Sequence, residues 1–329
     1  MLKKLTKSGE YTHMFIIVLT LIIYYLTPSI NFRSLVVNFD AAPFGNWIIG
    51  QTSANPQFVK PVNILLILGI ALYFNSISTS SDILPRQSYI TASLVTIFML
   101  FSPNESYFTC SLCVVLLLSF SMGNMAGMFG RQYPYLQVLN ATMAIAISSM
   151  IFPYTILFIF FVWFGFLTYS VNSWREWVIS IVGLVLPYTY LFFAFFWNDN
   201  LDFILNSYNS LFSNLSINFS LPSTDQLITL SLLTLFYLLS MFKFISEASD
   251  KIISIRKRMW LTFQFSFMCL IVMALSGNTI YLLLPVIYVP LALMLSYSLH
   301  NQRRSRIYNV LLVLLIVSIV INRLLSFYA

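Results

Sequence analysis

Charged residues are scarce in this chain. Asp, Glu, Lys and Arg make up only 8% of its 329 residues, whereas soluble domains carry about a quarter. This scarcity excludes an ordinary water-soluble domain. Hydrophobic residues account for 59% of the chain, and they recur in runs close to the ~20 residues that cross a hydrocarbon core about 30 Å thick. The composition therefore predicts a polytopic, all-α membrane protein.

Several familiar chemical signatures are also missing. The sequence has no P-loop, no G-x-G-x-x-G and no H-E-x-x-H motif. Its two histidines, His13 and His300, fall near separate helix ends, and Cys110 and Cys113 of "CSLC" lie inside an apolar run, where packing is their favoured role. No acidic residue sits firmly in mid-helix, which weakens an ion-coupled transporter. We expect no cofactor, and nothing in the sequence supports a divalent metal.

Hydrophobic runs predict eleven transmembrane helices in a single transmembrane domain over residues 1–329. Two of these runs, 62–77 and 136–151, are short enough to be re-entrant rather than crossing. The predicted spans are about 12–27, 62–77, 88–101, 107–122, 136–151, 154–170, 178–197, 226–244, 260–275, 279–298 and 307–325.

The basic residues predict the orientation. With the N-terminus in the cytoplasm, fourteen of the 17 Lys and Arg residues fall in cytoplasmic segments, and only Arg33, Lys60 and Arg323 fall outside. Such a bias is typical of inner-membrane proteins and predicts N-in, C-out. The formal charge of +7 is then explained by cytoplasmic loops that meet anionic lipid head groups, so no nucleic-acid partner is expected.

Two external segments are long, at about 27–61 and 198–225. Stretches such as "NWIIG" and "LDFILNSYNSLFSNL" place apolar residues at near-helical spacing, which indicates short amphipathic external helices on the outer leaflet. Segments of this kind roof a cavity between helices in some proteins. They fit simple interfacial caps equally well.

Asp40, in "NFDAAPFGNW", is the leading candidate for chemistry. It is the only acidic residue between Glu10 and Asp82, and Arg33 and Lys60 share its external loop. A carboxylate beside two cations at a membrane surface suits a general base next to a bound lipid phosphate. The alternative is a solvated loop acid or a helix cap, which is the commoner role of such residues.

Other candidates surround this loop. Glu105, in the external turn "SPNESY", matters only if that turn approaches Asp40. Phe39, Phe44 and Trp47 are candidates for stacking on a sugar or a lipid. In "SVNSWREWVISIVGLVLPY", Glu176 favours the positive N-terminus of the following helix, with tryptophans at the interface. We interpret that stretch as an anchor rather than a catalytic site.

The same stretch carries a family resemblance. Residues 84–188, from "LPRQSY" through "FPYTILFIFFVWFGFLTYSVNSWREWVISIVGLVLPY", resemble an uncharacterised multi-pass inner-membrane family of Bacteroidota. Its members have a similar aromatic helix pair, an R-[EN]-W turn and a glycine-proline helix. The resemblance covers about the middle third of the chain and implies the bacterial inner membrane, without a function.

The topology resembles the C-type glycosyltransferases. They have about eleven to thirteen helices, short cytoplasmic loops, a long first external loop with an acid soon after the first helix, and a further external segment after the seventh. In that family the first-loop acid is the catalytic base and the donor is a polyprenyl-phosphate sugar. Asp40 matches that position, with Glu105 in the second external turn. The chain has no D-x-D or D-E pair, so it departs from the family there.

These features predict an inverting membrane glycosyltransferase that uses a lipid-linked sugar in envelope assembly. Arg33 or Lys60 would bind the lipid phosphate, and Asp40 would activate the acceptor. Two alternatives remain open: a non-catalytic subunit with a membrane-protein partner, and a lipid or polyprenol translocase. In each case membrane lipids are the expected surroundings.

Overall fold

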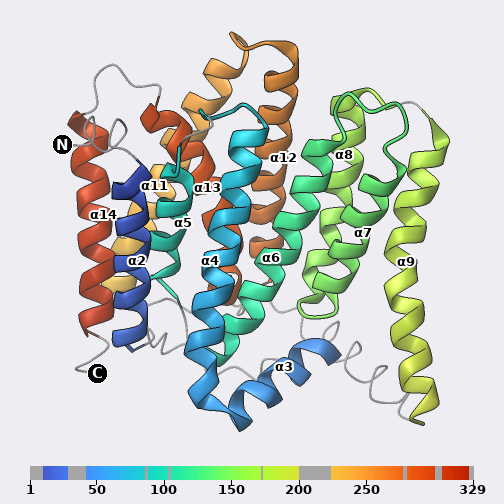
Figure 1. The fold of residues 1–329 in the computed structure, drawn as a ribbon, viewed down its shortest axis with the longest axis horizontal. Coiled ribbons are helices and arrows are strands. Elements are labelled where there is room, and N and C mark those ends of the chain that lie inside the picture. The colour runs from blue at the N-terminus through green and yellow to red at the C-terminus, as the bar shows by residue number, and fades with distance from the viewer. Residues whose placement is uncertain are drawn as a thin grey trace.

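The computed structural model describes residues 10–28, 42–85, 88–102, 105–171, 173–199, 224–276, 280–300 and 306–325. Every regular element within these residues is a helix (Figure 1). The helices are α2 (Glu10–Leu26), α3 (Pro43–Ala54), α4 (Pro56–Ser80), α5 (Ile90–Met99), α6 (Glu105–Gly127), α7 (Tyr135–Ser149), η2 (Pro153–Phe158), α8 (Ile159–Tyr169), α9 (Trp174–Trp197), α11 (Thr224–Ala248), α12 (Ile253–Leu275), α13 (Ile280–His300) and α14 (Arg306–Leu325).

Each predicted run has a helical counterpart. Six helices are long and apolar enough to cross a membrane: α4, α6, α9, α11, α12 and α13. The chain is therefore a multi-pass helical membrane protein. The run expected at 62–77 is the 25-residue α4, so its shortness was a misreading of where the helix begins. α7 has 15 residues, and eleven crossings and N-in, C-out remain predictions.

The centre of the bundle is built around α13. This helix is apolar on all sides, and 94% of its span is buried, as expected for a helix surrounded by others. The short α5 beside it has every residue buried. Hydroxyl groups link the central helices: Thr91 on α5 lies 3.4 Å from Ser78 on α4 and 3.1 Å from Ser296 on α13. Such bonds hold helices together where water is absent.

Small residues set the closest approach between α7 and α9, the outermost helix beside it in Figure 1. A Cβ atom on Gly183 would collide with the Thr142 side chain and lie 3.1 Å from the Leu139 carbonyl oxygen. Glycine therefore lets the two backbones touch. Pro187 follows one turn later inside α9.

The corner between α3 and α4 follows from the sequence "ANPQ". Asn55 precedes a proline, and its backbone is not helical, with φ −130° and ψ 65°. The proline ring disfavours a helical conformation in the residue before it. Pro56 then begins α4, where its missing N–H costs no hydrogen bond. As a result α3 lies across one end of the bundle while α4 runs along it (Figure 1).

Contacts between helices show which helix ends lie at the same end of the bundle. At the α3 end, the Lys60 ammonium on α4 donates to the Tyr25 carbonyl on α2 at 3.3 Å. At the opposite end, Lys243 of α11 donates to the Ser298 carbonyl of α13 at 2.8 Å. The first pair was predicted to be external and the second cytoplasmic. Which end faces the cytoplasm stays a prediction.

Candidate functional site

The segment that carries the leading candidate is bounded by two fixed points. Asp40, Arg33 and Phe39 lie outside the described residues, as does the side chain of Glu105. On one side of the segment, Pro28 is held by Arg323, whose Nη1 donates to its carbonyl at 2.7 Å. On the other side, Ala42 is fully buried. The chain therefore enters and leaves residues 29–41 at defined positions.

Helix α3 begins three residues after Asp40 and carries two of the predicted aromatic residues. Pro43 occupies its first turn, and the Phe44 N–H donates to the Met150 carbonyl at the end of α7 at 3.2 Å. The rings of Phe44 and Trp47 lie 6.2 Å apart. They are 44% and 62% exposed, so α3 presents aromatic surface at this end of the bundle, as an interfacial helix does.

A cavity of about 410 Å³ opens beside α3. Trp47 and Phe58 contribute aromatic surface, and Gln51, Asn55 and Thr109 contribute polar groups from α3, the α3–α4 corner and α6. An aromatic wall with a few amides and hydroxyls is a common composition for a small-molecule pocket. Among the site residues predicted from the sequence, Trp47 lines this cavity.

A polar network lies behind this cavity. Thr109 donates to the Asn63 side-chain oxygen at 2.8 Å, and the Asn63 amide donates to the Tyr24 hydroxyl at 3.1 Å. The network fixes α6, α4 and α2 relative to one another. Because Glu105 precedes Thr109 by four residues, its position on α6 is one turn from the cavity.

Lys60 does not line the cavity that Trp47 lines. Its ammonium lies at the C-terminal end of α2, on the Tyr25 carbonyl, where a cation is favoured by the helix dipole. The structure therefore does not join Lys60 and the aromatic residues around one cavity.

The structural role of Arg323 was not predicted from the sequence. It was counted only as an external basic residue, yet it is 1% exposed. Its Nε donates to the Leu100 carbonyl at 2.7 Å and its Nη2 to the Ser102 hydroxyl at 2.8 Å. Its guanidinium also lies 4.8 Å from the centre of the Tyr24 ring. The available signal was an ionisable residue within a hydrophobic run.

Arg323 thus stabilises a convergence of helix ends. It belongs to the last turn of α14 and donates to residues at the C-terminal ends of α2 and α5. The last carbonyls of a helix have no partner within it and carry the negative end of its dipole. A single guanidinium therefore satisfies several of them at once.

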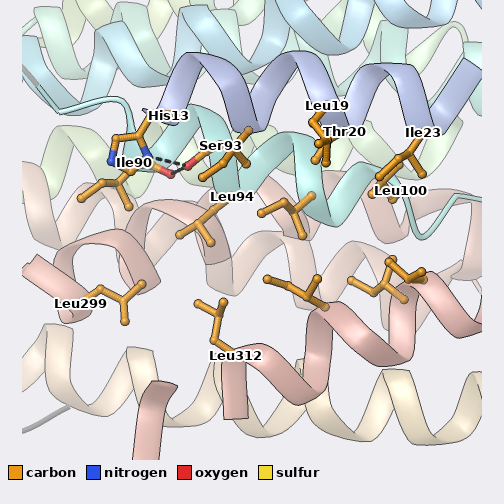
Figure 2. A pocket seen from close by; sticks show the side chains of 15 residues that line it. His13, Leu19, Thr20, Ile23, Ile90, Ser93, Leu94, Leu100, Leu299 and Leu312 are labelled. Carbon is orange, nitrogen blue, oxygen red and sulfur yellow. Dashed lines mark hydrogen bonds between the residues drawn. The ribbon is translucent and has the colours of Figure 1, made fainter. Parts of the chain in front are cut away.

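A second, apolar cavity runs between α2, α5 and α14 (Figure 2). Its volume is about 210 Å³. At one end the His13 ring nitrogen lies 3.4 Å from the Ser93 hydroxyl; at the other end are Ile23 and Leu100, beside the Arg323 cluster. His13 was expected near a cytoplasmic helix end, and it is 6% exposed there. The lining suits a hydrocarbon chain.

The cysteines and possible metal ligands add little chemistry here. Cys110, Cys113 and Cys269 are free thiols, and the Cys110 thiol lies 3.8 Å from the Gly45 carbonyl, between α6 and α3. Within the described ranges, His, Cys, Asp and Glu side chains form no group of three that could hold a metal ion.

Comparison with known proteins gives no relative. No family model, curated protein or solved structure matches this chain.

Proposed function

We propose that this protein is an integral membrane glycosyltransferase of C-type architecture, which transfers a sugar from a polyprenyl-phosphate donor in the bacterial inner membrane. The observation that carries the proposal is the cavity between α3, α4 and α6. It lies beside the helix that directly follows the Asp40 segment, and Trp47 forms part of its wall. An acid, an aromatic wall and polar groups at a membrane surface suit a sugar better than an ion.

The reaction we propose is a single displacement. Asp40 takes the proton of an acceptor hydroxyl, the hydroxyl oxygen attacks the anomeric carbon, and the bond from that carbon to the phosphate oxygen breaks. Polyprenyl phosphate leaves with the electron pair, and the anomeric configuration inverts. The proton remains on Asp40 until it exchanges with solvent. Arg33 or Lys60 stabilises the phosphate charge as it forms.

The donor has a polar sugar and an apolar isoprenoid chain, and one of the two cavities is partly polar while the other is apolar. The cavity beside α3 offers Gln51, Asn55 and Thr109 to sugar hydroxyls, with Trp47 for stacking. The cavity between α2, α5 and α14 is lined almost entirely by aliphatic side chains, which suits an isoprenoid chain. Pro28, at the start of the Asp40 segment, adjoins the end of the apolar cavity through Arg323.

The test is donor cleavage by the purified protein in lipid nanodiscs. A synthetic polyprenyl-phosphate hexose is supplied, water serves as the acceptor hydroxyl, and the released polyprenyl phosphate is measured by mass spectrometry. We expect release by the unchanged protein and a loss of about 10²- to 10⁴-fold in Asp40→Asn, the range for removal of a general base. Asp199→Asn is the matched control, because Asp199 is an exposed acid predicted on the same face.

Two results would contradict the proposal. Equal release by Asp40→Asn and the unchanged protein would remove Asp40 from the reaction. Absence of release by the unchanged protein, together with a membrane protein that copurifies in fixed ratio, would favour a non-catalytic subunit.

A further inference from the structure

A polar pocket lies between the α6–α7 loop and the α8–α9 turn. Its volume is about 360 Å³, and its lining includes Phe129 and Arg131 from the loop, Tyr169 and Ser173 from the turn, and Glu176 from α9. This volume falls within the range of about 300–1,000 Å³ typical of small-molecule sites. The pocket is on the opposite end of the bundle from α3, at residues predicted to be cytoplasmic.

Backbone conformation shapes both walls of this pocket. Gly130 has φ +82°, which glycine adopts without steric cost. Ser170 has φ 59°, and the Val171 N–H donates back to the Phe166 carbonyl at 2.9 Å. That pair of features is the Schellman ending of a helix. It turns the chain sharply between α8 and α9, so that Tyr169 and Glu176 face the same space.

Glu176 is the unusual group in the pocket. Its side chain is 4% exposed, and within the described part of the chain its Oε2 accepts no hydrogen bond. The sequence Ser173-x-x-Glu176 matches a capping box, yet Ser173 makes no side-chain cap hydrogen bond. A buried carboxyl oxygen without a donor is costly, and a ligand that supplies an N–H group would remove that cost.

Tyr169 provides a second unsatisfied polar group. Its hydroxyl is also buried without a hydrogen-bond partner in the described structure. Its ring is held 5.5 Å from the Phe129 ring, and the guanidinium of Arg258 and the ammonium of Lys257 lie 5.9 and 5.8 Å from the centre of that same ring. The hydroxyl therefore belongs to a residue that lines the same pocket as Glu176, and the Phe129 ring that packs against it also contacts two cations.

The mouth of the pocket favours an anion. Arg131 is exposed and lines the pocket, and the first N–H groups of α9 point outward from a helix N-terminus whose cap residue makes no side-chain bond. Exposed Tyr133, Leu136 and Trp174 flank this end, and aromatic residues there are typical of a membrane interface. The ligand therefore requires a cation at depth and a phosphate at the mouth.

We propose that this pocket binds a phosphoethanolamine group, with its primary ammonium on Glu176 and Tyr169 and its phosphate near Arg131. The group is the head of phosphatidylethanolamine, and it also occurs in soluble compounds. This site is separate from the proposed glycosyl transfer, because it lies at the other end of the bundle and shares no residue with the cavity beside α3.

The test is ligand binding to the full-length protein in dodecyl maltoside, followed by native mass spectrometry. Short-chain phosphatidylethanolamine and phosphatidylcholine are compared as probes. A quaternary ammonium has no N–H donor, so we expect the choline lipid to bind about tenfold more weakly. Glu176→Gln should weaken binding of the ethanolamine lipid by about tenfold, and Tyr169→Phe, which keeps the ring, should weaken it by a few-fold. Glu247→Gln, which removes an acid outside the pocket, should bind as the unchanged protein does.

The outcomes separate the proposal from trivial explanations. Unfolding temperatures of Glu176→Gln and Tyr169→Phe equal to that of the unchanged protein would show that lost binding is not lost folding. Displacement of the lipid by free phosphoethanolamine at similar concentration would assign the site to a soluble compound, and displacement only by the lipid would assign it to the membrane; both outcomes support the proposal. Equal binding of the two lipids, or unchanged binding in both variants, would overturn it.

Discussion

Among the Lys, Arg, Asp and Glu residues that the structure describes, Arg323 and Glu176 are the most buried, with 1% and 4% exposure. They lie at opposite ends of the bundle and differ in their partners. The Arg323 guanidinium donates to carbonyls and hydroxyls of the residues that directly follow α2 and α5. A carboxyl oxygen of Glu176 has no partner among the residues described.

Burial alone does not determine what a charged residue does. A buried charge whose hydrogen bonds are formed contributes to the architecture, because its removal strands the groups that it served. A buried charge with an unmet hydrogen bond destabilises the ligand-free protein and favours a ligand that completes it. We therefore assign Arg323 to structure and Glu176 to binding.

The largest effect is expected for Arg323→Met. The substitution leaves the carbonyls of Leu100 and Pro28 without their donor, at a cost of about 1–3 kcal/mol each. The free energy of unfolding, measured in mixed dodecyl maltoside and SDS micelles, should fall accordingly. Arg175→Met is the control, because Arg175 is exposed on α9 and its loss should change stability by less than about 0.5 kcal/mol. Equal losses in both variants would contradict a structural role for Arg323.

A smaller effect is expected for Gly183→Ala. The added Cβ meets the Leu139 carbonyl and the Thr142 side chain, so α7 and α9 must separate, at a cost of about 1–3 kcal/mol. Because α9 carries Glu176 two turns earlier, binding of the ethanolamine lipid should weaken as well. Gly69→Ala is the matched control: nothing lies within 4 Å of its Cβ position, and alanine there should stabilise α4 by up to about 1 kcal/mol. Loss of stability in both variants would remove the special role of Gly183.

Tyr24→Phe should cost less again. The ring that faces the Arg323 guanidinium is retained, and only the hydroxyl that accepts from Asn63 is lost. Hydrogen bonds between membrane helices contribute about 0.6 kcal/mol on average, and the same unfolding titration should detect a loss of this size. A loss as large as that of Arg323→Met would mean that the hydroxyl, and not the guanidinium, holds this end of the bundle together.

The smallest effect on folding is expected for Glu176→Gln. Because its Oε2 has no donor to lose and the substitution removes a buried charge, the free energy of unfolding without ligand should stay equal or rise, by less than about 1 kcal/mol. The comparison with Arg323 fails if this variant unfolds as easily as Arg323→Met, measured side by side.

The helices were predictable because each one coincides with a hydrophobic run, and most runs are separated by polar residues. The beginnings of α4 and α12 were not, since both helices continue into polar sequence: Pro56–Pro61 precedes the apolar run of α4, and "ISIRKRM" that of α12. A short helix was expected around "NWIIG", and α3 spans that stretch; its amphipathic, external character stays a prediction. The second expected stretch, "LDFILNSYNSLFSNL", lies outside the described residues. Hydropathy detects a run of apolar residues, whereas helix boundaries also depend on proline and cap positions.

The roles of Arg323 and Glu176 were harder to predict from the sequence. Arg323 contacts Leu100, which is 223 residues away in the chain, and no local pattern reports such a pairing. Glu176 was placed at the positive N-terminus of its helix, and the interpretation of that stretch as an anchor followed from this position and the neighbouring tryptophans. Its missing partner depends on how the α6–α7 loop packs over α9. Trp47, predicted to stack on a sugar or a lipid, lines the cavity beside α3, and its stacking role stays a prediction.

The most direct test of the functional account is a cryo-electron microscopy structure in nanodiscs that contain a polyprenyl-phosphate hexose. The account predicts density for the sugar against Trp47 and Thr109, with the isoprenoid chain between α2, α5 and α14. The Asp40 carboxylate should face the anomeric carbon from the side opposite the phosphate, with space between them for the acceptor hydroxyl. Density for the sugar phosphate in the Glu176 pocket, or its absence from the α3 cavity at saturating donor, would contradict it.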